Sequence, residues 1–421
     1  MLKDARVVTA DSTSSPVSTN RFRPILANRQ FRWFLASWTS ANVGYSVYAI
    51  SIVWLAYTVS HSFLIVGAVL FIEYATYTGV FLVGPIADRV GNQRTLYVAC
   101  YPVMGVAAMV IGVGQLNGFL TVPLLLALIA FISILWDIAW AAGNAAPGLL
   151  VSRDEQFAAQ GLIGAVGGAN AIAGYAAGGA LILLVGAEGG MILYGVLLVA
   201  AAILAVPLTI RPSPTPGETF GESFRAGWRL ITDPPGRPLL KLAVVDSIQG
   251  FFGAVPALLI TLLATSTFHS SASAFGVLFV SYVVGGTAAG LAFGQWNPRF
   301  HIGKIIVASL LGISGVLVVI VGLPSILVLE GAAFFLAGFL WSVYLDAKYS
   351  FFRGSFKPSE LGRLISNMYL IPGIASSVGA LSLGALANGV SPLELGSVAA
   401  VGFLGAGLLA LALPGIRTLR F

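Results

Sequence analysis

The chain has 421 residues, of which 57% are hydrophobic and only 9% are Asp, Glu, Lys or Arg, and its mean hydropathy is +0.92. A soluble domain carries about 25% charged residues, so the composition excludes a chain of soluble domains and predicts a membrane protein. One cysteine, Cys100, excludes a disulfide framework and a thiolate metal site, and the three histidines fall outside the long apolar runs. We therefore expect no metal and no cofactor.

The predicted elements begin with a tail. Residues 1–28 are rich in Ser, Thr, Pro and Arg and lack the apolar segment of a signal peptide, which predicts a disordered cytoplasmic tail. From Phe34 onward, apolar stretches recur, each near the length of about 20 residues that crosses a bilayer as a helix. They predict an all-α polytopic membrane protein with twelve spans, near residues 34–59, 64–83, 95–114, 121–145, 161–185, 190–210, 239–263, 274–296, 305–322, 327–349, 364–387 and 393–413.

The distribution of cations predicts the orientation of these spans. Cytoplasmic loops of membrane proteins accumulate Lys and Arg. With twelve spans both termini lie on one side, and all 22 Lys and Arg fall on that side, in loops, helix edges or termini. The pattern predicts a multi-pass protein of the plasma membrane with cytoplasmic termini. It also explains the net charge of +6 without a nucleic-acid partner.

A hydrophilic, proline-rich segment divides the chain into two halves. It predicts an N-terminal six-helix bundle at 29–210, a cytoplasmic central loop at 211–238, a C-terminal bundle at 239–415 and a cytoplasmic C-terminus at 416–421. An offset of 205 residues places Trp136 in register with Trp341, and Gly174 with Gly379. Such internal repetition indicates two homologous bundles.

The loop after the second span carries a recognisable motif. Residues 84–96 read GPIADRVGNQRTL, which resembles the loop signature of the major facilitator superfamily. Asn92 and Gln93 replace two basic residues of that signature, and Arg94 supplies a nearby charge. The resemblance implies a monomer with two pseudo-symmetric six-helix bundles that works by alternating access. It also implies a gating motif that locks the bundles together, formed by Gly84, Asp88, Arg89, Gly91 and Arg94.

The fifth span resembles the antiporter signature of the same superfamily. The matching positions are Gly161, Gly174, Gly178 and Gly179, whereas Asn170 and Tyr175 stand where the signature has glycine and proline. The resemblance implies export by antiport. Small residues four apart also let membrane helices approach closely, and we favour helix packing as the role of these glycines.

Four carboxylates lie within the predicted spans, namely Glu73, Asp137, Asp246 and Glu330. Each costs about 2.5–3.5 kcal/mol to insert, so we treat all four as candidates for proton coupling. No Lys or Arg lies at the depth of Glu73, and desolvation favours its protonated form. For the other three, hydrogen bonding between helices or snorkelling is an equal alternative. We interpret Asp346 and Lys348 as a local interfacial pair.

Aromatic and amide groups on the first, fourth, seventh and tenth spans are candidates for the lining of a substrate cavity. They are Asn42, Tyr45, Tyr48, Trp136, Trp140, Gln249, Trp341 and Tyr344. Trp and Tyr also gather at membrane interfaces, which is the alternative for any one of them. The lack of a mid-membrane arginine in these spans argues against phosphate or dicarboxylate substrates.

These features together predict a secondary transporter that exports a small amphipathic solute in exchange for protons. Two alternatives stay open: uptake or facilitated diffusion of a small metabolite, and a membrane sensor or scaffold that transports nothing. We expect no enzyme, because the sequence has no Walker A loop and no His-Glu-x-x-His motif. The expected partners are a small-molecule substrate, protons and the lipid bilayer.

Overall fold

The computed structural model describes residues 23–79, 93–152, 155–209, 220–232, 237–269, 271–295, 301–323, 325–356, 358–417 and 419. Within them, eleven helical stretches are long and apolar enough to cross a membrane. A shorter apolar helix, Phe63–Thr78, lies on the second predicted span, and the residues after position 79 are outside the described part. The predicted all-helical membrane protein is thus confirmed.

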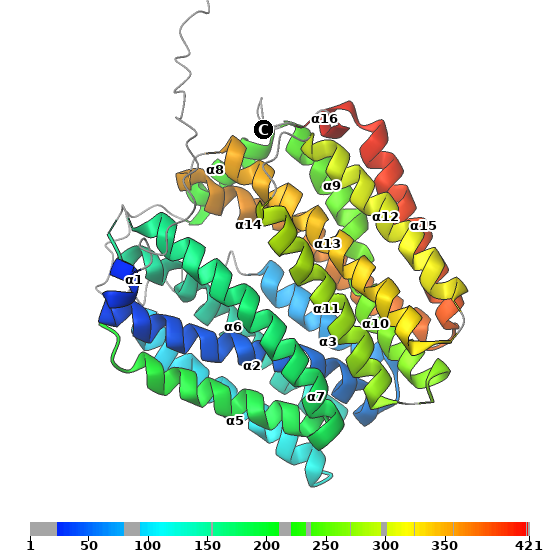
Figure 1. The fold of residues 1–421 in the computed structure, drawn as a ribbon, viewed down its shortest axis with the longest axis horizontal. Coiled ribbons are helices and arrows are strands. Elements are labelled where there is room, and N and C mark those ends of the chain that lie inside the picture. Colours follow the sequence, from blue (N-terminus) through cyan, green and yellow to red (C-terminus); the bar gives the residue numbers. More distant parts are fainter. Residues whose placement is uncertain are drawn as a thin grey trace, which may run out of the picture.

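The helices form two halves (Figure 1), the first coloured blue to green and the second, from α8 on, green to red. The first half contains α1 (Arg23–Ala27), α2 (Arg29–Ser60), α3 (Phe63–Thr78), α5 (Gln93–Leu116), α6 (Val122–Leu150) and α7 (Gln156–Ala205). The second contains α8 (Phe220–Thr232), α9 (Arg237–Phe251), α10 (Val255–Leu262), the π-helical turn η2 (Leu263–Thr267), α11 (Ala272–Gln295), α12 (Ile302–Gly322), α13 (Leu327–Ser355), α14 (Pro358–Ala387), α15 (Pro392–Ala412) and α16 (Pro414–Arg417).

Two short helices lie in segments for which the sequence predicted no span. Residues 23–27 of the predicted tail form α1, in which Ile25 is buried, and part of the predicted central loop forms α8. Helix α8 has apolar residues on one side, including the buried Ile231, and exposes Arg225 and Arg229 on the other. It packs against α14 and α9, so part of this segment is a structured element.

Capping groups fix the ends of several spans. Asn28 begins α2 by accepting hydrogen bonds from the backbone N–H groups of Gln30 and Phe31. Its amide nitrogen donates to the carbonyl of Leu150 at 2.8 Å, which ties the start of α2 to the end of α6. The start of α15 has a capping box between Ser391 and Glu394.

Helix α7 contains the fifth and sixth spans without an intervening loop. The chain reverses at Gly186, whose φ of 73° and ψ of 173° belong to a region that is essentially restricted to glycine. The segment before Gly186 runs parallel to α2, with Gly174 against Ser46, and the segment after it returns antiparallel, with Ser37 donating to the carbonyl of Ala201.

The repeat seen in the sequence is visible in the helices. Helices α6 and α13 each have 29 residues, and their first and last residues are shifted by the same 205 positions. Equivalent helices at a constant offset support a duplicated half.

The cations of the described residues gather toward one end of the molecule, which we name the basic end. Arg29 and Arg32 at the start of α2 and Lys304 at the start of α12 lie there. The backbone N–H of Gly303 bonds to the carbonyl of Leu419, which brings the start of α12 and the C-terminal residues together. The other end is named the opposite end.

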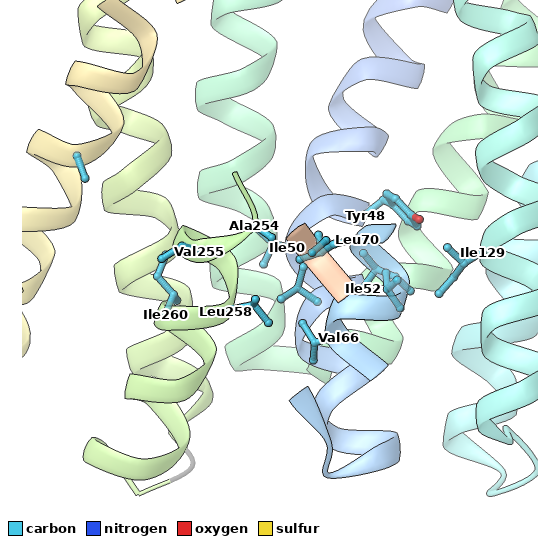
Figure 2. Close-up of a cluster of buried hydrophobic side chains, with 14 of the residues drawn as sticks. Tyr48, Ile50, Ile52, Val66, Leu70, Ile129, Ala254, Val255, Leu258 and Ile260 are labelled. Atoms are coloured by element: carbon cyan, nitrogen blue, oxygen red, sulfur yellow. The ribbon is translucent and has the colours of Figure 1, made fainter. Parts of the chain in front are cut away.

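The two halves meet tightly at the opposite end. A Cβ on Gly384 of α14 would lie 2.7 Å from the Cα of Gly67 in α3, and the side chain of Asn388 accepts a hydrogen bond of 2.8 Å from the N–H of Phe63. Figure 2 shows Leu258 of α10 pointing toward α2 and α3, which α10 contacts. Apolar packing therefore closes this end.

Toward the basic end, α7 and α11 separate. They touch near Gly179 and Gly276, where a Cβ on Gly276 would lie 3.3 Å from the carbonyl of Gly179. Two turns and more toward the basic end, no neighbouring atom of the described residues lies within 4 Å of the Cβ positions of Gly161, Gly164 and Gly168. The halves thus diverge between α7 and α11 in the direction of the basic end.

Candidate functional site

The first half places two carboxylates near each other. Glu73 is half-buried on α3, and Asp137 on α6 is 4% exposed. Asp137 lies within electrostatic range of both Glu73 and the Thr76 hydroxyl, and its Oδ2 atom has no hydrogen-bond donor among the described residues. Within the same part of the chain, no Lys or Arg forms an ion pair with either carboxylate. Among the described residues, no cation therefore neutralises the negative charge of these two carboxylates.

Tyrosines surround Glu73. The hydroxyl of Tyr48 lies close enough to interact with the carboxylate, and Tyr45, Tyr175 and Tyr194 are within electrostatic range of it. Tyr48 and Tyr194 have ring centroids 4.9 Å apart, and neither hydroxyl has a hydrogen-bond partner among the described residues. Glu73 thus faces phenol groups that can donate a hydrogen bond to an ionised carboxylate.

The predicted cavity residues of the first half follow this arrangement only in part. Tyr45 stacks on Trp136, with centroids 4.5 Å apart and planes inclined by 13°. Asn42 donates its amide to the carbonyl of Trp38 in its own helix, and Trp140 is exposed. Tyr45 and Trp136 therefore lie together beside the carboxylates, whereas the amide nitrogen of Asn42 is hydrogen-bonded within its own helix.

The second half contains a buried ion pair. The Nζ atom of Lys348 on α13 lies 3.2 Å from Oδ2 of Asp246 on α9, and the Tyr344 hydroxyl donates to Oδ1 of the same carboxylate. All three residues are at most 5% exposed. The interpretation of Lys348 as the interfacial partner of Asp346 is wrong, because Lys348 pairs with a different helix. Tyr344 is fully buried, where it orients Asp246.

Aromatic rings surround the ammonium of Lys348 and extend from it across the boundary between the halves. The Nζ atom lies 5.4 to 5.6 Å from the centroids of Tyr344, Tyr349 and Tyr369, a distance suited to cation–π attraction. Tyr369 of α14 meets Tyr77 of α3 edge-on, with centroids 5.6 Å apart, and Tyr77 meets Trp140 of α6 at 5.9 Å.

This series of rings has chemical contacts at both ends. Tyr77 lies within electrostatic range of Asp137, and Tyr369 contacts the ammonium that neutralises Asp246. Ring contacts, and electrostatic proximity at the Asp137 end, therefore connect the carboxylates of the first half to the ion pair of the second. We name the set Glu73, Asp137, Tyr77, Tyr369, Lys348 and Asp246 the cross-bundle network.

The remaining predicted carboxylate and cavity residues lie elsewhere. Glu330 is 2% exposed in the first turn of α13 near the opposite end, and its Oε2 atom has no hydrogen-bond donor among the described residues. Gln249 is buried on α9. Trp341 packs against Phe403, with centroids 6.2 Å apart. These three residues are not part of the cross-bundle network.

The glycine residues of the antiporter-like signature face different neighbours. Gly174 and Gly178 pack against α2, and Gly179 packs against Val280 of α11. Within the part of the chain that the structure describes, no atom lies within 4 Å of the Cβ position of Gly161. In the loop motif, Gly84, Asp88, Arg89 and Gly91 lie outside the described residues, and Arg94 is half-buried in the first turn of α5.

Sequence reasoning missed Lys348, Tyr77 and Tyr369. The tenth span was expected to end at residue 349, which placed Lys348 at the interface. Helix α13 continues to Ser355, so Lys348 lies seven residues, about 10 Å, inside the helix end. The run of aromatic residues that includes Tyr349 and Phe352 was the signal for this extension.

Comparison with known proteins identifies relatives over most of the chain. The model of the transmembrane secretion effector family matches residues 19–418. The enterobactin exporter EntS of Citrobacter koseri is 25% identical over 358 residues, which is 81% of this chain and 81% of EntS.

Solved transporter structures share the fold. A mutant of the nucleoside transporter NupG aligns with a TM-score of 0.74 at 11% identity, covering 91% of this chain and 99% of NupG. A bacterial homologue of the human lysosomal transporter Spinster, in an inward-facing and unoccupied conformation, aligns with a TM-score of 0.69 at 14% identity, covering 95% of this chain and 98% of the homologue. These matches confirm the predicted arrangement of helices.

Proposed function

Because this chain belongs to the transmembrane secretion effector family of the major facilitator superfamily, we propose that it exports a small amphipathic solute in exchange for protons. Membership makes the chain a transporter and not an enzyme. The outward direction is supported by its relative EntS, which is an enterobactin exporter. At 25% identity, the similarity to EntS is evidence for the direction of transport and not for a particular substrate.

The observation that carries proton coupling is the pair of carboxylates in the first half. Glu73 and Asp137 interact with each other, lack an ion-pair partner among the described residues and lie beside the boundary between the halves. Carboxylates of this kind exist at low energy either protonated or exposed to water. A proton that binds from one side and leaves on the other would satisfy both requirements during alternating access.

The divergence of the halves supports the same cycle. The basic end is open between α7 and α11, and the opposite end is closed by α3, α10 and α14. We propose that the basic end faces the cytoplasm, since short cytoplasmic loops accumulate cations. The conformation would then be inward-facing, ready to take a solute from the cytoplasmic side.

The second half supplies a reason to favour neutral or cationic solutes. Lys348 is a buried cation, but Asp246 and three tyrosine rings already neutralise and surround it. An anionic solute would have to compete with the carboxylate at 3.2 Å. We therefore retain the proposal of a lipophilic solute without a strong negative charge.

Transport by purified protein in proteoliposomes tests the proposal. A panel of amphipathic compounds is measured with and without an imposed pH gradient, for the wild type, Glu73→Gln and Asp137→Asn. Glu188→Gln is the matched control, because Glu188 lies beside the Gly186 turn at the opposite end. We expect gradient-driven flux in the wild type and the control, and its loss in the two test variants.

Each alternative function has its own outcome in this assay. Flux that ignores the gradient in all four proteins would contradict proton coupling and favour a facilitator. Uptake driven by the gradient would contradict the direction. The absence of flux for every compound would favour a sensor or scaffold.

A further inference from the structure

A groove lies where the two halves separate toward the basic end. Its volume is about 590 Å³, and α7, α11 and α13 form its walls. Gly164, Gly168 and Tyr175 contribute from α7, Tyr282 and Thr287 from α11, and Trp341 from α13. A volume between about 300 and 1,000 Å³ is typical of sites for small molecules.

The groove is lined by α7 and α11, two helices on one side of the helix bundle. In Figure 1 the spanning helices run approximately in the plane of the drawing, and α7 and α11 lie on the side that faces the reader. This side is a lateral one, which a bilayer would cover. Gly164 of α7 and Leu291 of α11 both line the groove and are exposed, Leu291 to 60%. A groove that opens between these two helices would face the lipid of the leaflet at the basic end.

The residues that line the groove determine which class of solute can bind in it. Among the described residues, the lining contains no Asp, Glu, Lys or Arg, although Oδ2 of Asp346 would lie 3.9 Å from a Cβ on Gly290 behind one wall. The lining includes three large aromatic rings, those of Tyr175, Tyr282 and Trp341. The absence of neighbours at the Cβ positions of Gly164 and Gly168 leaves a flat wall against which a ring can lie. Thr287 donates its hydroxyl to the carbonyl of Val283, so its oxygen is left as an acceptor. These features suit a planar, uncharged group with few polar atoms.

The inner end of the groove leads to the candidate functional site. Tyr175 lines the groove, lies within electrostatic range of Glu73 and has its ring centroid 6.2 Å from that of Phe279. Beyond it, the contact of Gly179 with α11 closes the path toward the opposite end. A solute that moves inward along the groove would therefore arrive beside the carboxylate pair.

We propose that this groove is an entry port through which a planar, uncharged amphipathic solute passes from the lipid leaflet at the basic end into the transporter. The proposal rests on the export function and specifies the substrate class and its route. A port of this kind takes its substrate at the concentration in the leaflet, which for a lipophilic compound far exceeds that in water.

Reversible obstruction of the groove tests the port. Gly164→Cys is made in a Cys100→Ala background, because Cys100 is the single native cysteine. The protein is reconstituted in proteoliposomes, modified with benzyl methanethiosulfonate and later reduced. The probe is Nile red, an uncharged planar dye. We expect modification to lower its initial transport rate by about tenfold and reduction to restore it. A folding defect would not be restored.

Gly315→Cys is the matched control. Its Cβ position is equally free of neighbours and it is exposed, but it lies on α12 and does not line the groove. Its modification is expected to leave transport unchanged. Equal inhibition in both variants, or none in Gly164→Cys while the wild type transports Nile red, would overturn the proposal.

Protection from labelling separates this proposal from the export function. Nile red in the vesicles is expected to slow the reaction of N-ethylmaleimide with Gly164→Cys at least about threefold and to leave that of Gly315→Cys unchanged. Protection without any transport would retain the groove as a binding site and contradict export. Transport without protection or obstruction would retain export and contradict the port. The absence of both transport and protection would contradict the groove as a site for this class of solute.

Discussion

Lys348 and Asp246 form a buried ion pair at 3.2 Å, although 102 residues separate them in the chain. The pair joins α13 to α9 within the second half, and the Tyr344 hydroxyl occupies the other carboxylate oxygen. Because removal of one partner leaves an uncompensated buried charge, the pair makes a sharp test of the structure.

We expect Asp246→Asn to destabilise the protein by about 3–5 kcal/mol, since the ammonium of Lys348 would lose its counter-ion in the interior. The double variant Asp246→Asn with Lys348→Met removes both charges and should recover most of the loss. Thermal unfolding in detergent measures both. An Asp246→Asn protein as stable as the wild type would contradict the buried pair.

The contact between Gly67 and Gly384 gives a prediction about the boundary of the halves. In Gly384→Val the new Cβ would collide with the backbone of α3, so we expect a destabilisation of about 1–3 kcal/mol and a loss of transport. Gly389→Val is the control, because no atom of the residues that the structure describes lies within 4 Å of its Cβ position. Unfolding temperature and initial flux are measured side by side, and equal behaviour of the two variants would argue against this contact.

If Glu73 and Asp137 share one transported proton, the effects of their substitutions on proton coupling should not add. We expect the double variant Glu73→Gln with Asp137→Asn to reduce gradient-driven flux no further than the more damaging single variant does. Flux at a series of imposed gradients provides the comparison. Multiplicative losses would indicate two independent roles for the carboxylates.

The orientation in the cell can be tested with single cysteines in a Cys100→Ala background. Asn117→Cys lies in the turn after α5 at the opposite end, and Thr209→Cys lies after α7 at the basic end, and both native side chains are exposed. A membrane-impermeant maleimide added to intact cells should label Asn117→Cys alone. Labelling of Thr209→Cys would mean that the basic end faces outward.

The sequence was sufficient to predict the spans because the length of an apolar run directly reflects the thickness of the bilayer. The helix ends were less predictable. Helix α13 extends past the expected residue 349 to Ser355, because its last turns carry the large side chains of Tyr349 and Phe352 together with Lys348. A segment that mixes aromatic and charged residues can remain helical because of tertiary packing, which a hydropathy profile does not detect.

The partners within the candidate site could not be predicted for a geometric reason. Asp246 and Lys348 were both visible as unusual residues, but their pairing depends on the rotation and crossing of α9 and α13. The same holds for Tyr77 and Tyr369, which meet only because α3 packs along α14. Asp137 and Glu73 were identified because a carboxylate in an apolar run is conspicuous without any knowledge of its neighbours.

The turn at Gly186 has a practical consequence for anyone who wishes to display an epitope on this protein. The reversal is made by one residue in a conformation open only to glycine, and a side chain there would collide with Glu188. A tag inserted at that point would break the hairpin between the fifth and sixth spans. The longer exposed turn at residues 117–119 is the better place for an antibody to reach the opposite face.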